Sequence, residues 1–208
     1  MAHTTVTAQV VIDAGLARYK DPAETQWADA ELLVYLNKGI EYIFKMLIAA
    51  KSDLATTVGS VTTSATQEFA LPDDLWGICP AGVSISGGIT KPLGVATYED
   101  KIRGGTTATS VDPKLYYLTA DKIGLIPIPN ATSAAAYTTL SIRYWKKPSA
   151  LALTGNMPYL NIFNDAIAAF VDAMAFLRNQ ESAEIVMQIY NTLEQAVMLV
   201  VKNHTPEV

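Results

Sequence analysis

The residues best suited to acid–base chemistry are two adjacent aspartates, Asp73 and Asp74, which follow Leu71-Pro72 and precede Trp76. Hydrolysis of a glycosidic bond needs two carboxyl groups on opposite sides of a sugar, and Trp76 would supply an aromatic platform beside them. Neighbouring aspartates after a proline are more often a turn whose side chains bond the local backbone. We favour the turn and keep a carboxylate-based hydrolase of cell-wall glycan as an alternative.

The other reactive side chains are isolated. His3 and His204 lie in the terminal segments, where order is least expected, and neither has a neighbouring ligand or base in the sequence. Cys79 is the one cysteine, so no internal disulfide or thiolate cluster can form, and a small buried side chain is its expected role. The GxSxG, HExxH, Walker A and GxGxxG patterns do not occur. We therefore predict no catalytic residue, no metal and no cofactor.

A small basic and aromatic patch is formed by Lys146-Lys147 beside Tyr144 and Trp145. A solvated strand end explains it better than a nucleic-acid contact, because the chain has 15 Lys+Arg against 20 Asp+Glu and a net charge of −5. Proteins that bind nucleic acid by neutralising phosphates are basic. Asn130-Ala131-Thr132 matches a glycosylation sequon, but the first residues, MAHTTVTAQ, do not form a secretory signal. A reducing, intracellular origin is expected.

The composition indicates extensive contact with other protein. Of 208 residues, 50% are hydrophobic and 17% charged, whereas an ordinary globular chain has about 25% charged residues. No run approaches the roughly 18 apolar residues of a membrane span, so no membrane association is expected. The surplus apolar surface is most simply covered by other copies of the chain.

Periodicity predicts helices at both ends of the chain and strands between them. Apolar residues at three- and four-residue spacings predict helices at 7–19, 29–50, 161–179 and 182–202. Alternating or turn-bounded segments predict strands at 54–63, 67–71, 83–86, 92–96 and within 115–145, with a short helix at 98–103. The predicted fold class is α+β. An antiparallel bundle of about four helices (1–51 and 151–208) carries an inserted, mainly antiparallel β domain (52–150).

The helix after residue 158 is apolar on two faces. A first stripe of large residues includes Phe163, Ile167 and Phe170. One such face can serve the chain's own core, so we predict that the other contacts a neighbouring subunit. This second stripe consists of Ile162, Ala166, Ala169, Ala173 and Phe176. Segment 103–113 is predicted to be a mobile exposed loop, and segment 130–136 the tip of a long hairpin.

Several short motifs follow one another in a distinctive order. They are Trp27-x-Asp29-x-Glu31-Leu32-x-x-Tyr35-Leu36-Asn37, Leu71-Pro72-Asp73-Asp74, Lys91-Pro92-Leu93, Tyr116-Tyr117-Leu118, Ile123–Pro129 and Ile142–Pro148, followed by two closing helices. Over about residues 5–202 this order resembles the head-to-tail adaptor (connector, head-completion) proteins of tailed bacteriophages. Two positions depart from the family pattern: Ala28 replaces a hydroxyl residue, and Ala120-Asp121-Lys122 replaces a glycine turn.

The resemblance implies a structural virion protein of the phage neck, made in the host bacterial cytoplasm, and no enzyme. Such adaptors form a ring, commonly of about twelve copies, between the portal protein and the tail or nozzle, and the ring extends the DNA channel. Segments 103–113 and 130–136 would then face the tail. The predicted portal contacts are Lys202, Asn203, His204, Thr205 and Pro206.

DNA would pass through the lumen of such a ring without sequence-specific binding. About twelve copies at −5 each would carry about −60, and an acidic lumen would let DNA slide without adhering. Another structural protein of the tail is the second alternative function.

Overall fold

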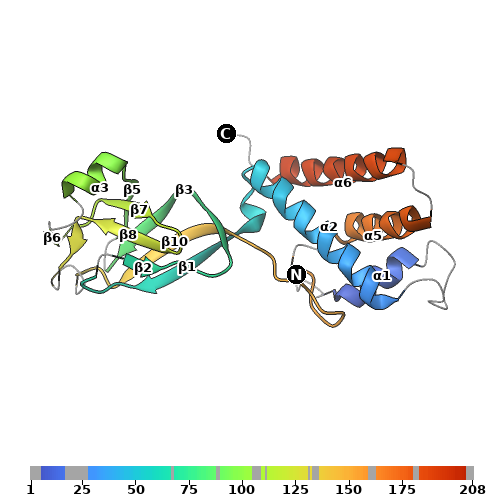
Figure 1. Cartoon of the computed structure of the whole chain (residues 1–208), viewed down its shortest axis with the longest axis horizontal. Coiled ribbons are helices and arrows are strands. Elements are labelled where there is room, and N and C mark those ends of the chain that lie inside the picture. The colour runs from blue at the N-terminus through green and yellow to red at the C-terminus, as the bar shows by residue number, and fades with distance from the viewer. Residues whose placement is uncertain are drawn as a thin grey trace. The chain divides into compact units, whose positions relative to one another are not determined.

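The computed structural model describes residues 6–16, 28–66, 68–87, 90–104, 109–110, 112–130, 132, 136–158, 163–179 and 183–204. The chain divides into two compact units. We call Met1–Ala55 with Lys147–Val208 the helical unit, and Thr56–Lys146 the β unit. The combination of helices with mainly antiparallel sheets confirms the predicted α+β fold class (Figure 1). Whether the units are independent domains, with the predicted limits at residues 52 and 150, stays a prediction.

Among the described residues of the helical unit, four α-helices pack together, and α5 lies between the others. It packs against α1, α2 and α6, which Figure 1 shows beside it. Ile167 and Phe170 from its large stripe are fully buried, and so is Phe163 just before the helix. The helices are α1 (Ala8–Leu16), α2 (Asp29–Ala49), α5 (Asn164–Asn179) and α6 (Ala183–His204).

Two glycines allow α1 and α2 to approach α5 closely. A Cβ on Gly39 of α2 would lie 2.9 Å from Cδ1 of Phe170, and a Cβ on Gly15 of α1 would lie 3.1 Å from the carbonyl oxygen of Ala168. The sequence pattern predicts both helices but gives no sign of these contacts. None of the described helices is both long and apolar enough to cross a membrane.

Helix α2 begins and ends with recognisable local interactions. Asp29 and Glu31 place negative charge in its first turn, which stabilises a helix amino terminus. At its end, the Ser52 N–H donates to the carbonyl of Leu47 at 2.9 Å, and Lys51 has a left-handed backbone with φ 52°. This is the usual glycine-type helix ending with a lysine in the glycine position. Leu54 and Ala55, predicted as the start of a strand, instead belong to a short 3-10 helix, Asp53–Ala55, because this helix ending turns the chain before the strand begins.

The segment that returns from the β unit is attached to α2 by one side chain. The Asn37 amide donates from Nδ2 to the carbonyl oxygen of Leu151 at 3.2 Å, and its Oδ1 accepts from the Leu151 N–H at 2.8 Å. The same segment meets α1, where the Ala8 N–H donates to the carbonyl of Gly155 at 2.9 Å. Asn37 ends the first adaptor-like motif, so this motif residue joins two parts of the chain that are 114 positions apart.

Where the β unit is described, its strands form two four-stranded sheets and one additional strand pair. The first sheet is antiparallel and has the order β1 (Thr56–Thr62), β10 (Thr139–Lys146), β3 (Leu75–Ser86), β4 (Thr90–Pro92). The second has the order β2 (Glu68–Ala70), β8 (Lys122–Ile126), β7 (Leu115–Leu118), β5 (Gly94–Val95), with β5 parallel to β7. Strands β6 (Thr109–Ser110) and β9 (Ile128–Pro129) form a parallel pair.

Both sheets contribute to one core in the β unit. Val83, Ile85, Leu140 and Ile142 come from the first sheet, and Ile123 from β8 of the second; all five are fully buried. The predicted alternation of the last strand is therefore correct, since β10 buries Leu140, Ile142 and Tyr144 on one face.

Four predictions about the β unit require correction. Segment 130–136 is not the tip of a hairpin, because β9 before it pairs with β6 and β10 after it belongs to the first sheet. The strand predicted at 83–86 is the end of the longer strand β3. The strand predicted at 92–96 is interrupted at the buried residue Leu93, because β4 before it and β5 after it belong to different sheets. Segment 103–113 is not simply a mobile loop. Helix α3 (Tyr98–Gly104), predicted at 98–103, extends into this segment. The segment also contains β6, and its last residue, Pro113, is buried. Residues 105–108 and 111 of this segment lie outside the described residues.

Strand β3 contains a wide bulge. Val83 pairs with Ile142 and Ile78 with Tyr144, so four residues, Cys79–Gly82, lie opposite the single residue Arg143. Ala81 has φ 51°, and a Cβ on Gly82 would lie 2.7 Å from the carbonyl oxygen of Cys79. Cys79 is buried, as the sequence predicts.

Candidate interaction surfaces

The predicted subunit-contact stripe lies on the side of α5 that is least covered. Ala166, Ala169 and Ala173 are each half-buried, whereas Ala168 and Val171, elsewhere on the helix circumference, are fully buried. The stripe is therefore neither core nor fully open surface. Ile162 lies outside the described residues, and Phe176 belongs to α5 but its side chain is not described. Their contact with another subunit stays a prediction.

The predicted portal contacts lie at and after the end of α6. Lys202 is exposed, Asn203 and His204 are the last two residues of the helix, and Thr205 and Pro206 lie outside the described residues. Just before Lys202, Met198 and Leu199 expose 52% and 63% of their side chains. The described end of the helix thus combines apolar side chains with a positive charge.

The two segments predicted to face the tail are joined at one end of the β unit. Strand β6 lies in segment 103–113 and pairs with β9, which directly precedes segment 130–136. The carboxylate of Asp112 accepts hydrogen bonds from Lys91 Nζ at 2.9 Å and from the Tyr137 hydroxyl at 3.1 Å. The hydrogen bond from Lys91, together with that from Tyr137, lowers the pKa of Asp112.

Lys91 also lies over the ring of Tyr137, 5.3 Å from its centroid. The Lys91, Asp112 and Tyr137 cluster thus holds three segments together: β4, the residues before β7 and the residues before β10. Sequence reasoning missed it. Lys91-Pro92-Leu93 was noted as a motif, but nothing in the sequence reveals its partners at positions 112 and 137.

Asp74, one of the two candidate hydrolase carboxylates, is held by two structural interactions. It accepts a hydrogen bond from the Tyr144 hydroxyl at 2.7 Å, and it forms an ion pair with Lys146 at 3.2 Å. The hydrogen bond from Tyr144 is the main cause that lowers the pKa of Asp74. A general acid in glycoside hydrolysis needs the opposite, a raised pKa that keeps the proton.

The same contacts explain the basic and aromatic patch. Tyr144 is buried, burial raises the pKa of its hydroxyl to about 12, and the bond to Asp74 adds to the shift. Lys146 pairs with Asp74, and Lys147, the residue after β10, is exposed. Two of the four patch residues, Tyr144 and Lys146, therefore attach the turn at 73–74 to β10.

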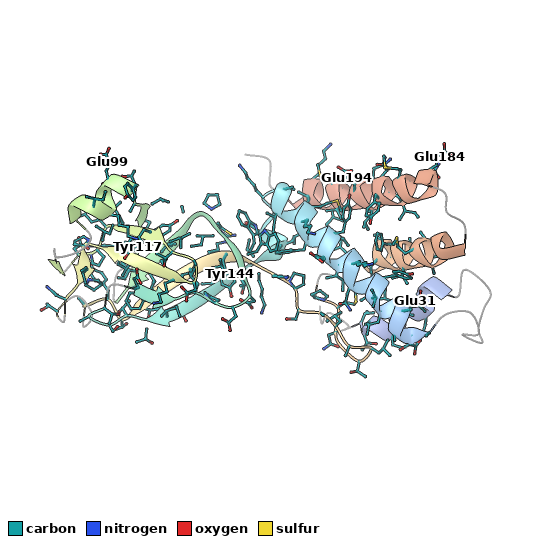
Figure 2. All side chains as sticks on the ribbon, viewed as in Figure 1. Glu31, Glu99, Tyr117, Tyr144, Glu184 and Glu194 are labelled. Carbon is teal, nitrogen blue, oxygen red and sulfur yellow. The ribbon has the colours of Figure 1, made fainter. Side chains whose placement is uncertain are left out.

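Tyr117 has the corresponding role in the second sheet. Its hydroxyl donates to Glu68 Oε1 at 3.1 Å, and burial raises its pKa to about 12. Lys101 of α3 lies over the Tyr117 ring, 4.4 Å from the centroid, and so holds the short helix on the sheet. A Cβ on Gly124 would overlap this ring, so the close packing requires glycine there. Tyr117 and Tyr144 are labelled in Figure 2 within the β unit.

A metal site in the described residues would need a group of side chains that could bind the ion. Within those ranges, no three His, Cys, Asp or Glu side chains form a group that could hold a metal ion. His3 lies outside the described residues. The informative features are therefore surfaces and the contacts that shape them.

Comparison with known proteins gives one family. The model of the SU10 adaptor protein family matches residues 6–205, which includes almost the whole of both units. A comparison with curated proteins found no match.

Proposed function

The chain belongs to the SU10 adaptor protein family of phage structural adaptors, and we propose that it forms a ring in the phage neck between the portal protein and the tail or nozzle. The family match over residues 6–205 carries this proposal, because it spans the helical unit and the β unit together. As a phage adaptor the protein is a virion component and structural. We further propose that it is made in the host cytoplasm, that the ring has about twelve copies and that DNA passes through its lumen.

The α5 stripe supports the lateral contact of the ring. Ala166, Ala169 and Ala173 are half-buried, and their small side chains would let a helix of a neighbouring subunit approach closely. Helices α1, α2 and α6 pack on α5, and the stripe keeps part of its surface accessible, which supports a contact with another chain. A ring of identical copies needs a surface of this kind that meets a different surface on the next copy.

The two proposed contact surfaces have different chemistry. The end of α6, with exposed Met198, Leu199 and Lys202, suits a protein contact, and we assign it to the portal. The segments joined by Asp112, in the β unit, are assigned to the tail or nozzle. Exposed apolar side chains on α3, Tyr98 at 78% and Ile102 at 61%, lie beside this second surface in the sequence and add apolar area to it.

Electron microscopy of the chain with purified portal tests the ring. We expect Ala169→Glu to abolish ring formation and leave the helical circular dichroism unchanged, because a charged side chain would enter a close helix contact. Ala30→Glu is the matched control: Ala30 is an exposed alanine of α2, so this variant should assemble normally. Intact rings from a folded Ala169→Glu variant would refute the assignment of the stripe.

A further inference from the structure

Strand β1 is an open and unprotected sheet edge. It is the outermost strand of the first sheet, and within the described ranges only β10 pairs with it. Its seven residues, TTVGSVT, contain no charge and no proline, and its register against β10 is continuous, without a bulge. Natural proteins usually protect such an edge with charges, prolines, bulges or short strands, because it can template pairing with another chain.

The other sheet edges of the β unit are protected in these ways. Strand β4, at the opposite edge of the same sheet, has three residues and includes Lys91 and Pro92. The edges of the second sheet are β2, with three residues, and β5, with two. Strand β1 therefore differs from every other described edge in length, and from β4 and β2 also in having no charged residue.

The direction of its backbone groups follows from one hydrogen bond. The Thr63 N–H donates to the carbonyl oxygen of Thr138 at 3.1 Å, directly after the last paired residues of β1 and β10. Backbone groups alternate along an antiparallel strand, so Val61, Gly59 and Thr57 also point toward β10. The N–H and C=O groups of Val58 and Ser60 then point away from the sheet. Their side chains are exposed as well, Val58 at 66%.

We propose that two copies of the free chain pair along β1, antiparallel and about a two-fold axis at Gly59. The strand is self-compatible about this glycine, because no charged or bulky residue lies on either side of it. Val58 of one copy lies opposite Ser60 of the other, and Thr57 opposite Val61, so only small or β-branched uncharged side chains meet. The two exposed Val58 side chains become diagonal neighbours across the axis, which buries the one large apolar side chain that the strand exposes. The two sheets become one continuous sheet.

This pair is a state of the chain before assembly, and it goes beyond the proposed ring. A two-fold contact uses the same surface on both copies, whereas a ring of identical subunits uses two different surfaces. Pairing along β1 therefore covers a sheet edge that could otherwise pair with other chains before the ring assembles. This contact does not involve the α5 stripe.

Light scattering coupled to size exclusion tests the pair on the full-length chain without portal. The native chain should elute as a dimer. Val58→Lys should raise the dissociation constant of the dimer at least tenfold, because two lysine side chains would lie close together beside the two-fold axis. Val95→Lys is the matched control, since Val95 is an equally exposed valine (71%) on β5 of the other sheet, and it should remain dimeric. Ser60→Pro should also give a folded monomer, because it removes an N–H that β10 does not use.

A cross-linking experiment tests the register. In a Cys79→Ala background, Val58→Cys and Ser60→Cys chains are oxidised separately and as a mixture. The mixture should give more disulfide-linked dimer than either chain alone, because positions 58 and 60 lie opposite each other only in the proposed pairing.

A monomeric native chain, self-association that Val58→Lys leaves unchanged, or no preference for the mixed disulfide would each overturn the proposal. Val58→Lys should still form rings on the portal. A ring failure in all variants would refute the proposed function and would leave the β1 pair standing.

Discussion

Replacing Asn37 by alanine should detach the segment that returns from the β unit. The Asn37 amide makes two hydrogen bonds to the backbone of Leu151, one through Nδ2 at 3.2 Å and one through Oδ1 at 2.8 Å. A net contribution of about 1 kcal/mol for each gives about 2 kcal/mol. Alanine recovers about 0.5 kcal/mol through its higher helix propensity. The expected loss in the free energy of unfolding is therefore about 1.5 kcal/mol.

Urea unfolding followed by helical circular dichroism measures this loss, and hydrogen exchange of the Leu151 amide shows where it occurs. The amide should be protected in the native chain and exchange much faster in Asn37→Ala. Lys38→Ala is the control, because Lys38 is an exposed neighbour on the same helix, and it should change the stability by less than about 0.5 kcal/mol. If Asn37→Ala unfolds like the native chain and the Leu151 amide keeps its protection, the side chain does not hold this segment.

Three further substitutions test individual contacts. Gly124→Ala should destabilise the β unit by about 1–3 kcal/mol in thermal unfolding, because the new Cβ would overlap an aromatic ring. Gly77→Ala is the control and should leave the stability nearly unchanged, since the new Cβ would lie at an ordinary contact distance of 3.5 Å from Cε3 of Trp145. Lys51→Gly should stabilise the chain by about 0.5–1 kcal/mol, because glycine has no Cβ to penalise the left-handed backbone, whereas Lys45→Gly within α2 should cost about 1 kcal/mol. The folded protein lowers the pKa of Asp74, so this carboxylate stabilises the fold above its ordinary pKa of 3.8, and the stabilisation is lost as the pH falls through the lower folded pKa. In Asp74→Asn, the free energy of unfolding should therefore fall less steeply as the pH is lowered through this range.

Long, strongly periodic segments were predictable from the sequence. The apolar spacing in α2 and the double stripe in α5 need no knowledge of distant residues, and the alternation in β10 identifies its buried face. The ordered motifs also indicated a phage adaptor, which the family match confirms. In these cases local periodicity and order carry the information.

Features that depend on distant partners were not predictable. Leu93 separates two short strands only because the sheets on either side bury it, and the Cys79–Gly82 bulge is defined by its partner Arg143. The contacts of Asn37 with Leu151 and of Asp112 with Lys91 join residues far apart in the chain. The alanine stripe is where it was expected on α5, but its partner belongs to another chain, so its role stays a prediction.

Imaging of the chain on purified portal protein tests the central claim most directly. Single-particle electron microscopy of the mixture should show a closed ring of about twelve copies on the portal, with a lumen continuous with the portal channel. A portal that binds no additional density at saturating concentrations of folded chain, or that binds isolated copies which never close into a ring, would contradict the account.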